Sequence, residues 1–271
     1  MIRALGLTIG LLIVASSVTS AQAPPATLRE MLDGAIEQFT VFAGEEEKEP
    51  AKTVVALRWA NNARGSEDGM TLLYVHHGRP LAAACIYPWN GRVIHDFESL
   101  TTDRIVARRG DQTVWRPQTG GVEFANVPDA PAPAATAAQR LRQMKSIAAE
   151  FESTMLGWKA DSTDREELRL LTKPLYRYEP AKETGLLDGA VFGFAMGTDP
   201  ESLLLLQAIG DKEDAKWQFA FARRTSGELE GRYREKVVWN AARYPKEGNP
   251  LSPHFGIGTP IPAELLLKPA E

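Results

Sequence analysis

Short strand-like segments separated by tight turns dominate the first half of this 271-residue chain. These apolar or alternating segments span residues 53–61, 70–77, 80–88, 93–100, 104–109 and 113–117. Turn residues separate them, at 67–69, Gly78-Arg79, Asn90-Gly91, Gly110-Asp111 and Gly120-Gly121. Such connections are too short for the crossover of a dozen or more residues that parallel strands require. The sequence therefore predicts an antiparallel meander, with Asn90-Gly91 as its clearest two-residue hairpin turn.

The second half of the chain has the same pattern of short strand-like segments and turns. Its expected strands span residues 165–171, 190–196, 203–209, 217–223, 229–234 and 237–240. Asp199 and Pro200 favour a type I turn over residues 198–201. Two interpretations of this similarity are open. The β-rich halves, 51–127 and 160–243, arose by duplication, or they share only the sequence pattern that is common to all meanders.

Two amphipathic helices are expected beside the strands. Thr27 and Glu30 form a capping box, and apolar residues at helical spacing extend the first helix over 28–42. A Pro/Ala connector over 128–136 leads into a second helix ending near 157. Its apolar face is a stripe of residues three and four apart: Leu141, Met144, Ala148, Phe151 and Met155. We expect an α+β fold in which these helices pack on antiparallel sheets of about a dozen strands, as one compact unit over residues 24–271.

The N-terminus resembles a secretory signal peptide. Arg3 precedes an apolar run over residues 4–14, and small residues follow it over 15–23. The apolar run is shorter than the ~20 residues of a membrane span. We expect cleavage after Ala21, with Ala23 as the alternative, and an exported, periplasmic or extracellular protein with no stable membrane insertion.

Composition narrows the function classes. The formal net charge of −4 argues against a nucleic-acid partner, because such proteins present a strongly basic face. Cys85 is the single cysteine, so no intramolecular disulfide can form, and its apolar neighbours predict a buried, inert thiol. The acidic run over residues 45–49 is typical of a solvated loop.

Four residues are candidates for ligand binding: Trp89, His95, Asp96 and Glu98. Trp89 adjoins the predicted Asn90-Gly91 turn, where an exposed ring can stack on a sugar. Strand alternation places His95 on an apolar face and the two acids about 7 Å apart on the other. That spacing suits both a glycosidic carboxylate pair and two solvated acids. Because His95 and Asp96 point apart, we expect no metal site there, and no motif indicates a cofactor or identifies catalytic residues.

Four segments of the chain carry a resemblance to known proteins: Arg64-Gly-Ser-Glu-Asp-Gly69, Tyr87-Pro-Trp-Asn-Gly91, residues 165–171 with 174–178, and Gly197-Thr-Asp-Pro-Glu201. Together they resemble a family of uncharacterised exported proteins from planctomycete-type bacteria. The resemblance covers most of the chain after the signal peptide. It implies an exported bacterial protein and no particular activity, so no site residues follow from it.

Three functions remain open, each with an unknown ligand or protein partner. The first is a non-catalytic binding or structural module of the periplasm or cell surface, because no catalytic motif is visible. The second is a hydrolase of an exported or carbohydrate substrate that uses His95, Asp96 or Glu98. The third is a carrier of a small apolar ligand. An enzyme requires a concave pocket with convergent titratable groups, and a carrier requires an enclosed apolar cavity.

Overall fold

The computed structural model describes residues 27–44, 46–61, 66–157, 163–181, 184–211, 214–244 and 248–266. The predicted signal peptide and both cleavage positions fall within residues 1–26, outside these ranges. None of the described helices is both long enough and apolar enough to cross a membrane.

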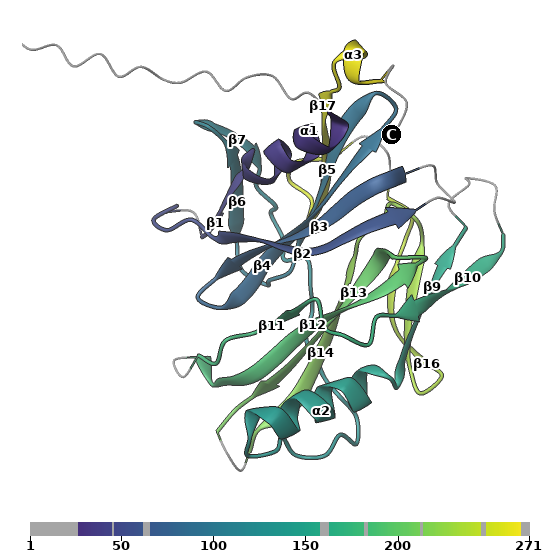
Figure 1. Ribbon diagram of the computed structural model, residues 1–271. Coiled ribbons are helices and arrows are strands. Elements are labelled where there is room, and N and C mark those ends of the chain that lie inside the picture. The colour runs from purple at the N-terminus through teal and green to yellow at the C-terminus, as the bar shows by residue number, and fades with distance from the viewer. Residues whose placement is uncertain are drawn as a thin grey trace, which may run out of the picture.

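The fold is mostly antiparallel β, with 53% strand and 17 strands in three sheets among the described residues (Figure 1). A small sheet has the order β1 (Thr40–Ala43), β6 (Ile105–Arg109) and β7 (Gln112–Trp115). A five-stranded sheet has the order β17 (His254–Pro260), β5 (Arg92–Ser99), β4 (Arg79–Trp89), β3 (Ser66–His76) and β2 (Lys52–Asn61). The strand count exceeds the predicted dozen because the sequence pattern misses short pairings such as β1.

The third sheet has nine strands. Its order is β16 (Lys236–Ala241), β15 (Leu229–Tyr233), β9 (Phe151–Leu156), β10 (Arg165–Leu170), β12 (Leu186–Met196), β13 (Asp199–Ile209), β14 (Lys216–Arg223) and β8 (Ala125–Asn126), with β11 (Tyr176–Arg177) beside β12. Strands β16 and β14 are far apart in this order but are in contact. Trp239 of β16 stacks on Phe221 of β14, with ring centroids 5.3 Å apart. The sheet therefore curls back on itself.

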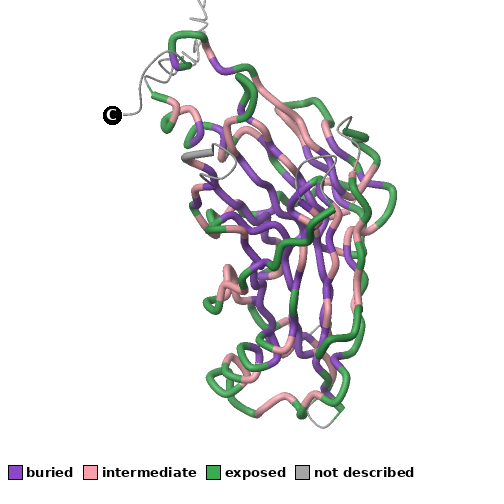
Figure 2. Tube along the Cα trace, turned by 90° about the vertical axis from the view of Figure 1, so that its right-hand side faces the viewer, coloured by how far each residue is buried: buried purple, intermediate pink, exposed green. Residues whose placement is uncertain are grey.

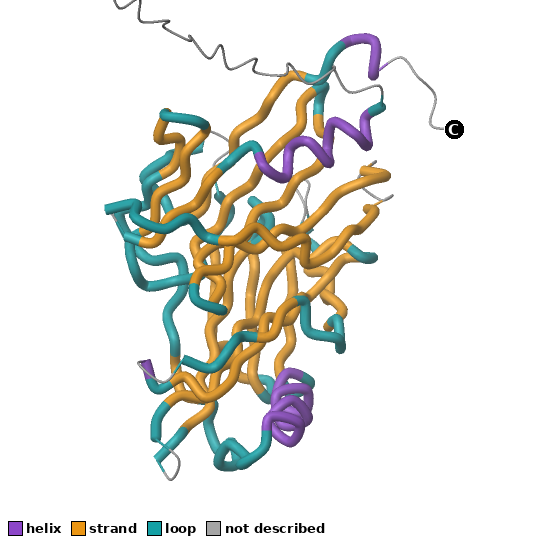
Figure 3. Tube along the Cα trace, turned by 60° about the vertical axis from the view of Figure 1, so that its left-hand side comes forward, coloured by secondary structure: helices purple, strands orange, loops and turns teal. Residues whose placement is uncertain are grey.

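Three hydrophobic cores hold the layers together. One contains Leu32 and Trp115 and lies between the five-stranded sheet and the elements α1, β1, β6 and β7. A second contains Met144 and Phe192, on the concave side of the nine-stranded sheet with helix α2. The third, which includes Leu73 and Leu205, joins the two large sheets face to face. Buried segments accordingly run through the middle of the molecule (Figure 2), and α1 and α2 lie toward opposite ends (Figure 3).

The two halves share the order of their elements and most of their strand pairings, although β9 pairs with β10 whereas β1 and β2 belong to different sheets. In the first half, α1 and β1 precede the β2–β5 meander, and β6 then returns to pair with β1 and β7. In the second half, α2 and β9 precede β10, β12, β13 and β14, and β15 pairs with β9 and β16. The shared order begins at the helix of each half, so it extends beyond 51–127 and 160–243. Duplication as its origin stays a prediction.

Both helices are shorter than predicted. Helix α1 (Leu28–Gly34) has the predicted capping box, but a 3₁₀ turn over Ala35–Glu37 ends it before β1. Helix α2 (Ala137–Ala148) ends well before residue 157. Phe151 and Met155 belong to β9, because a spacing of four fits strand alternation as well as a helical period, and pairing with β10 and β15 decides between them. A third helix, α3 (Ala263–Leu266), was not predicted.

Two predicted turns are also wrong. Residues 67–69 belong to β3, where Gly69 pairs with Trp59 across the ladder. Asp199 and Pro200 open β13, and the turn lies at Gly197 and Thr198 instead. The Asn90-Gly91 turn is confirmed, with φ values of 48° and 70° that suit a type I′ hairpin.

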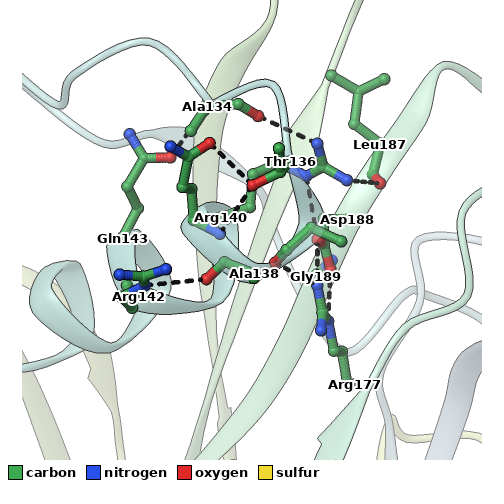
Figure 4. A network of polar contacts seen from close by, with 12 residues as sticks. Ala134, Thr136, Ala138, Arg140, Arg142, Gln143, Arg177, Leu187, Asp188 and Gly189 are labelled. Carbon is green, nitrogen blue, oxygen red and sulfur yellow. Dashed lines mark hydrogen bonds and ion pairs between the residues drawn. The ribbon is translucent and has the colours of Figure 1, made fainter.

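A buried acid fastens helix α2 to the curled sheet (Figure 4). Asp188 of β12 is 1% exposed and accepts hydrogen bonds from Arg140 Nε at 3.0 Å and from Arg177 Nη2 at 2.7 Å. Arg140 Nη1 also donates to the carbonyl oxygens of Ala134 and Ala135, at 3.0 and 2.9 Å. Arg140 therefore links the end of the Pro/Ala connector and the start of α2 to the Asp188 carboxylate.

Candidate functional site

A cleft of about 720 Å³ opens between one end of the five-stranded sheet and the nine-stranded sheet. Strands β2, β4, β5 and β17 contribute one wall, and the start of β13 and the segment after β14 contribute the other. Its chemistry comes from aromatic, acidic and basic side chains: Trp59, Tyr87, Trp89, Tyr244, Asp96, Asp199, Glu201, His254, Arg92, Arg224 and Arg243. The cleft thus depends on both halves of the chain.

Asp96 is the acid of β5 that reaches the cleft. Its Oδ2 accepts a hydrogen bond of 2.6 Å from the hydroxyl of Tyr87. Burial raises the pKa of Asp96 above its ordinary value, although the Tyr87 hydrogen bond and the charge of Arg224 act in the opposite direction. A buried carboxyl group with a raised pKa can hold or release a proton nearer neutral pH than an exposed aspartate can.

Two further acids face Asp96 from β13. Asp199 and Glu201 are 7% and 1% exposed, and both line the cleft. Asn61, at the end of β2, donates from Nδ2 to Asp199 Oδ2 over 3.1 Å. The two acids are two residues apart on one strand, as Asp96 and Glu98 are on β5. Alternation points Asp96 and Glu98 to the same side of β5, whereas the β12–β13 register is irregular at Glu201. Three of the four carboxylates line the cleft.

Arg224 supplies a buried positive charge among these acids. It is 3% exposed, and its Nη1 donates to the backbone carbonyl oxygen of Asp96 over 3.4 Å. Its charge lowers the pKa of Asp96 and also that of Glu98, in both cases against a larger effect of burial. Among the described residues, its Nε and Nη2 have no hydrogen-bond partner. The guanidinium therefore acts chiefly as a countercharge at the base of the cleft.

Glu98 and His254 form a buried pair next to the cleft. They are directly opposite across the β5–β17 ladder, with His254 Nδ1 and Glu98 Oε2 2.9 Å apart. Burial raises the pKa of Glu98 well above its ordinary range and lowers that of His254 to about 3. Both shifts favour the neutral forms, so a single proton joins the oxygen and the nitrogen.

Aromatic rings form the rest of the cleft wall. Trp59 is 5% exposed, and its ring lies 6.1 Å from that of Tyr87. Trp89 ends β4 next to the confirmed hairpin turn and is 49% exposed. Such exposure is unusual for so large an aromatic side chain. Trp89 can therefore offer a ring to a molecule entering the cleft.

The four predicted site residues separate into three environments. Trp89 and Asp96 line the cleft, and Glu98 lies behind its lining in the pair with His254. His95 points to the other side of β5, as alternation predicts. Its Nε2 donates to the Ala35 carbonyl over 3.2 Å, its ring packs on Phe39, and burial lowers its pKa to about 4. His95 thus lies in the core and does not line the cleft.

The predicted set omits most of the side chains that line the cleft, among them Asp199, Glu201, Arg224 and His254. Asp199 and Glu201 were assigned to a turn, although two acids two apart before the leucine run 203–206 also fit one face of a strand. Arg224 follows an apolar strand, and His254 follows a segment without strand character. No local pattern places these residues opposite Asp96.

The cleft can bind a ligand through hydrogen bonds and ring contacts, and its acids can exchange protons with a bound molecule. Cys85 also lines it but is buried, and burial raises the pKa of its thiol, which disfavours the reactive thiolate. Comparisons of the chain with family models, with curated proteins and with solved structures gave no match.

Proposed function

We propose that this protein is a non-catalytic binding module, exported to the periplasm or cell surface, that holds a small polyhydroxylated ligand of the saccharide class in the cleft. The observation that carries the proposal is the meeting of Asp96, Asp199 and Glu201 with an exposed Trp89 around one cavity. The volume of about 720 Å³ falls within the range typical of small-molecule sites.

Saccharide chemistry suits this lining. Sugar hydroxyl groups donate to carboxylates and accept from guanidinium and amide groups, and both kinds of partner line the cleft. The C–H face of a sugar ring packs on an aromatic ring, which Trp89 provides at 49% exposure. An apolar ligand would exclude water from these acids without offering hydrogen bonds in return, so the same lining argues against an apolar carrier.

The test is calorimetric titration of the mature protein with neutral, amino and acidic mono- and oligosaccharides. We expect at least one class to bind in a 1:1 ratio. Trp89→Ala and Asp96→Asn should each weaken that binding about tenfold or more, since each removes a principal contact. The matched controls are Val237→Ala, at an apolar side chain 46% exposed on β16, and Asp111→Asn, at an exposed acid. Both should leave the affinity unchanged.

Two results would overturn the proposal. One is the absence of binding across all saccharide classes. The other is binding that survives both cleft substitutions, which would place the ligand elsewhere on the protein.

The raised pKa of Asp96 favours a second candidate, a glycoside hydrolase in which Asp96 donates the proton and Asp199 or Glu201 is the second carboxylate. In this candidate, the mature protein cleaves oligosaccharides, and either Asp199→Asn or Glu201→Gln removes cleavage while retaining binding. Binding without products after prolonged incubation favours the binding module.

A further inference from the structure

A second cluster of side chains with ligand chemistry lies away from the cleft, at the tip of the β3–β4 hairpin. His77 and Gly78 form the two-residue turn, with φ values of 46° and 72°. Consecutive strand residues normally point to opposite faces, but the left-handed conformation of His77 turns its side chain toward that of His76. The two imidazole rings meet edge to face, with their centroids 4.0 Å apart.

Glu49 completes the cluster from the connection between β1 and β2. Its Oε2 lies 3.7 Å from His76 Nε2 and 3.5 Å from His77 Nε2. The three potential ligand atoms all lie within 4.8 Å of one another. Among the described residues, no other group of three or more His, Cys, Asp or Glu side chains meets that condition.

These spacings suit ligands arranged around an ion better than direct hydrogen bonds. Protein N–H···O bonds are mostly 2.7–3.2 Å long, so both contacts to Glu49 exceed that range. A tetrahedral Zn²⁺ with bonds of about 2.0–2.1 Å separates its ligand atoms by about 3.3 Å. Small rotations of the exposed Glu49 and His77 side chains, which are 63% and 71% exposed, would close the remaining difference.

The hairpin tip is held in place by the second half of the chain. The backbone N–H of Glu179 donates to the Gly78 carbonyl over 3.0 Å, and the Tyr176 hydroxyl reaches the same oxygen over 3.4 Å. His76 is only 19% exposed and is thus a partly fixed ligand. The two imidazoles are therefore close together before any ion arrives.

We propose that Glu49, His76 and His77 bind a divalent transition metal, with Zn²⁺ as the ion whose geometry they fit. Imidazole and carboxylate ligands suit Zn²⁺, Cu²⁺ and Ni²⁺, whereas Mg²⁺ and Ca²⁺ favour sets made of oxygen atoms. Three protein ligands leave a fourth position for water or another ligand. The ion would fasten the β1–β2 connection to the hairpin tip.

The experiment is calorimetric and thermal-shift titration of the mature protein, carrying no histidine tag, with ZnCl₂ and with MgCl₂. We expect 1:1 binding of Zn²⁺ and a rise in melting temperature, because an ion that binds only the folded chain stabilises it. MgCl₂ should do neither.

Two substitutions locate the ion. His77→Asn removes a ligand but keeps a residue that tolerates the left-handed conformation, and Glu49→Gln removes the carboxylate. Each should weaken Zn²⁺ binding about tenfold or more, with an unchanged circular dichroism spectrum. Glu46→Gln, at an exposed acid in the same connection, is the matched control and should bind as the wild type does. Absence of Zn²⁺ binding, or binding that both ligand substitutions leave intact, would overturn the proposal.

Discussion

At the scale of single residues, His95 and Asp96 are neighbours in sequence but lie on opposite sides of β5. His95 contacts the Phe39 ring in the core shared with α1, and Asp96 contacts the Tyr87 hydroxyl in the cleft. Burial moves the two pKa values in opposite directions, down for His95 and up for Asp96. In both cases the neutral form is favoured, as expected for groups withdrawn from water.

The His95 shift leads to a testable pH dependence. Between about 4 and 6.5, the unfolded chain binds a proton at His95 that the folded chain does not. The contribution of His95 to the free energy of unfolding should therefore fall as the pH decreases through this window. His95→Phe keeps a ring beside Phe39 and Phe97 and should reduce the slope by up to about 1.4 kcal/mol per pH unit.

Urea denaturation at a series of pH values measures that slope. Val237→Ala, at an exposed side chain that does not titrate, should keep the wild-type slope. An unchanged slope in His95→Phe would show that the imidazole is not kept neutral by the fold.

The position of a single residue could be predicted from sequence only where it follows from the alternation or the turn of one strand. Alternation along β5 places His95 in the core and points Asp96 and Glu98 the other way, and the hairpin turn accounts for the exposure of Trp89. Alternation along β5 does not indicate that Glu98 meets His254, because that contact depends on β17, which is 156 residues away. Glu201 and Arg224 reach the cleft through the packing of two sheets.

At the scale of elements, the close packing of β2 against β3 requires a glycine in β3. Trp59 lies directly opposite Gly69, and a Cβ at Gly69 would be 2.4 Å from the Trp59 ring. The predicted turn at 67–69 failed for this reason: the glycine is needed for close packing rather than for a turn. The position of Trp59 in the cleft wall thus depends on a residue of the neighbouring strand.

Gly69→Ala should displace the Trp59 ring, lower the free energy of unfolding by about 1–3 kcal/mol and weaken ligand binding in the cleft. The same substitution at Gly34 in helix α1 meets no atom within 4 Å and should stabilise the protein by up to about 1 kcal/mol. Chemical denaturation of the two variants measures whether the free energy of unfolding falls in Gly69→Ala and rises in Gly34→Ala. Equal stability of the two variants would contradict the close approach at Gly69.

Helix α2 depends on the Asp188 carboxylate in a similar way. Asp188→Ala leaves the Arg140 guanidinium, 12% exposed, without its acid and should cost about 3–5 kcal/mol of unfolding free energy. Asp129→Ala, at an acid 88% exposed, should cost less than about 1 kcal/mol. Denaturation curves of both variants test the difference, and a small loss in Asp188→Ala would mean that the connector and α2 are held by packing alone.

At the scale of the whole molecule, the apolar faces of the two large sheets form a shared core. Leu205 is 1% exposed in that core, so Leu205→Ala should cost about 2–5 kcal/mol. Because the core belongs to both halves, we expect one unfolding transition, with the same midpoint by circular dichroism and by tryptophan fluorescence. Leu251→Ala, at a side chain 44% exposed, is the control. Two separate transitions would show that each half folds independently.

The antiparallel character of the molecule could be predicted from short turns alone, but the way its sheets meet could not. Helix α2 was assigned too long because Phe151 and Met155 satisfy two periods at once, and the tertiary pairing of β9 chose between them. Strand β1 also became assignable only through a partner distant in sequence, β6.

The position of the cleft at the boundary between the halves has a thermodynamic consequence. A molecule that contacts Asp96 on one side and Glu201 on the other connects the two halves of the chain. Its affinity is therefore coupled to the free energy with which the halves associate. A substitution that loosens the shared core enough to populate separated halves should also reduce occupancy of the cleft, however distant it is from the ligand. Leu205→Ala would then behave as a binding mutant without touching what is bound.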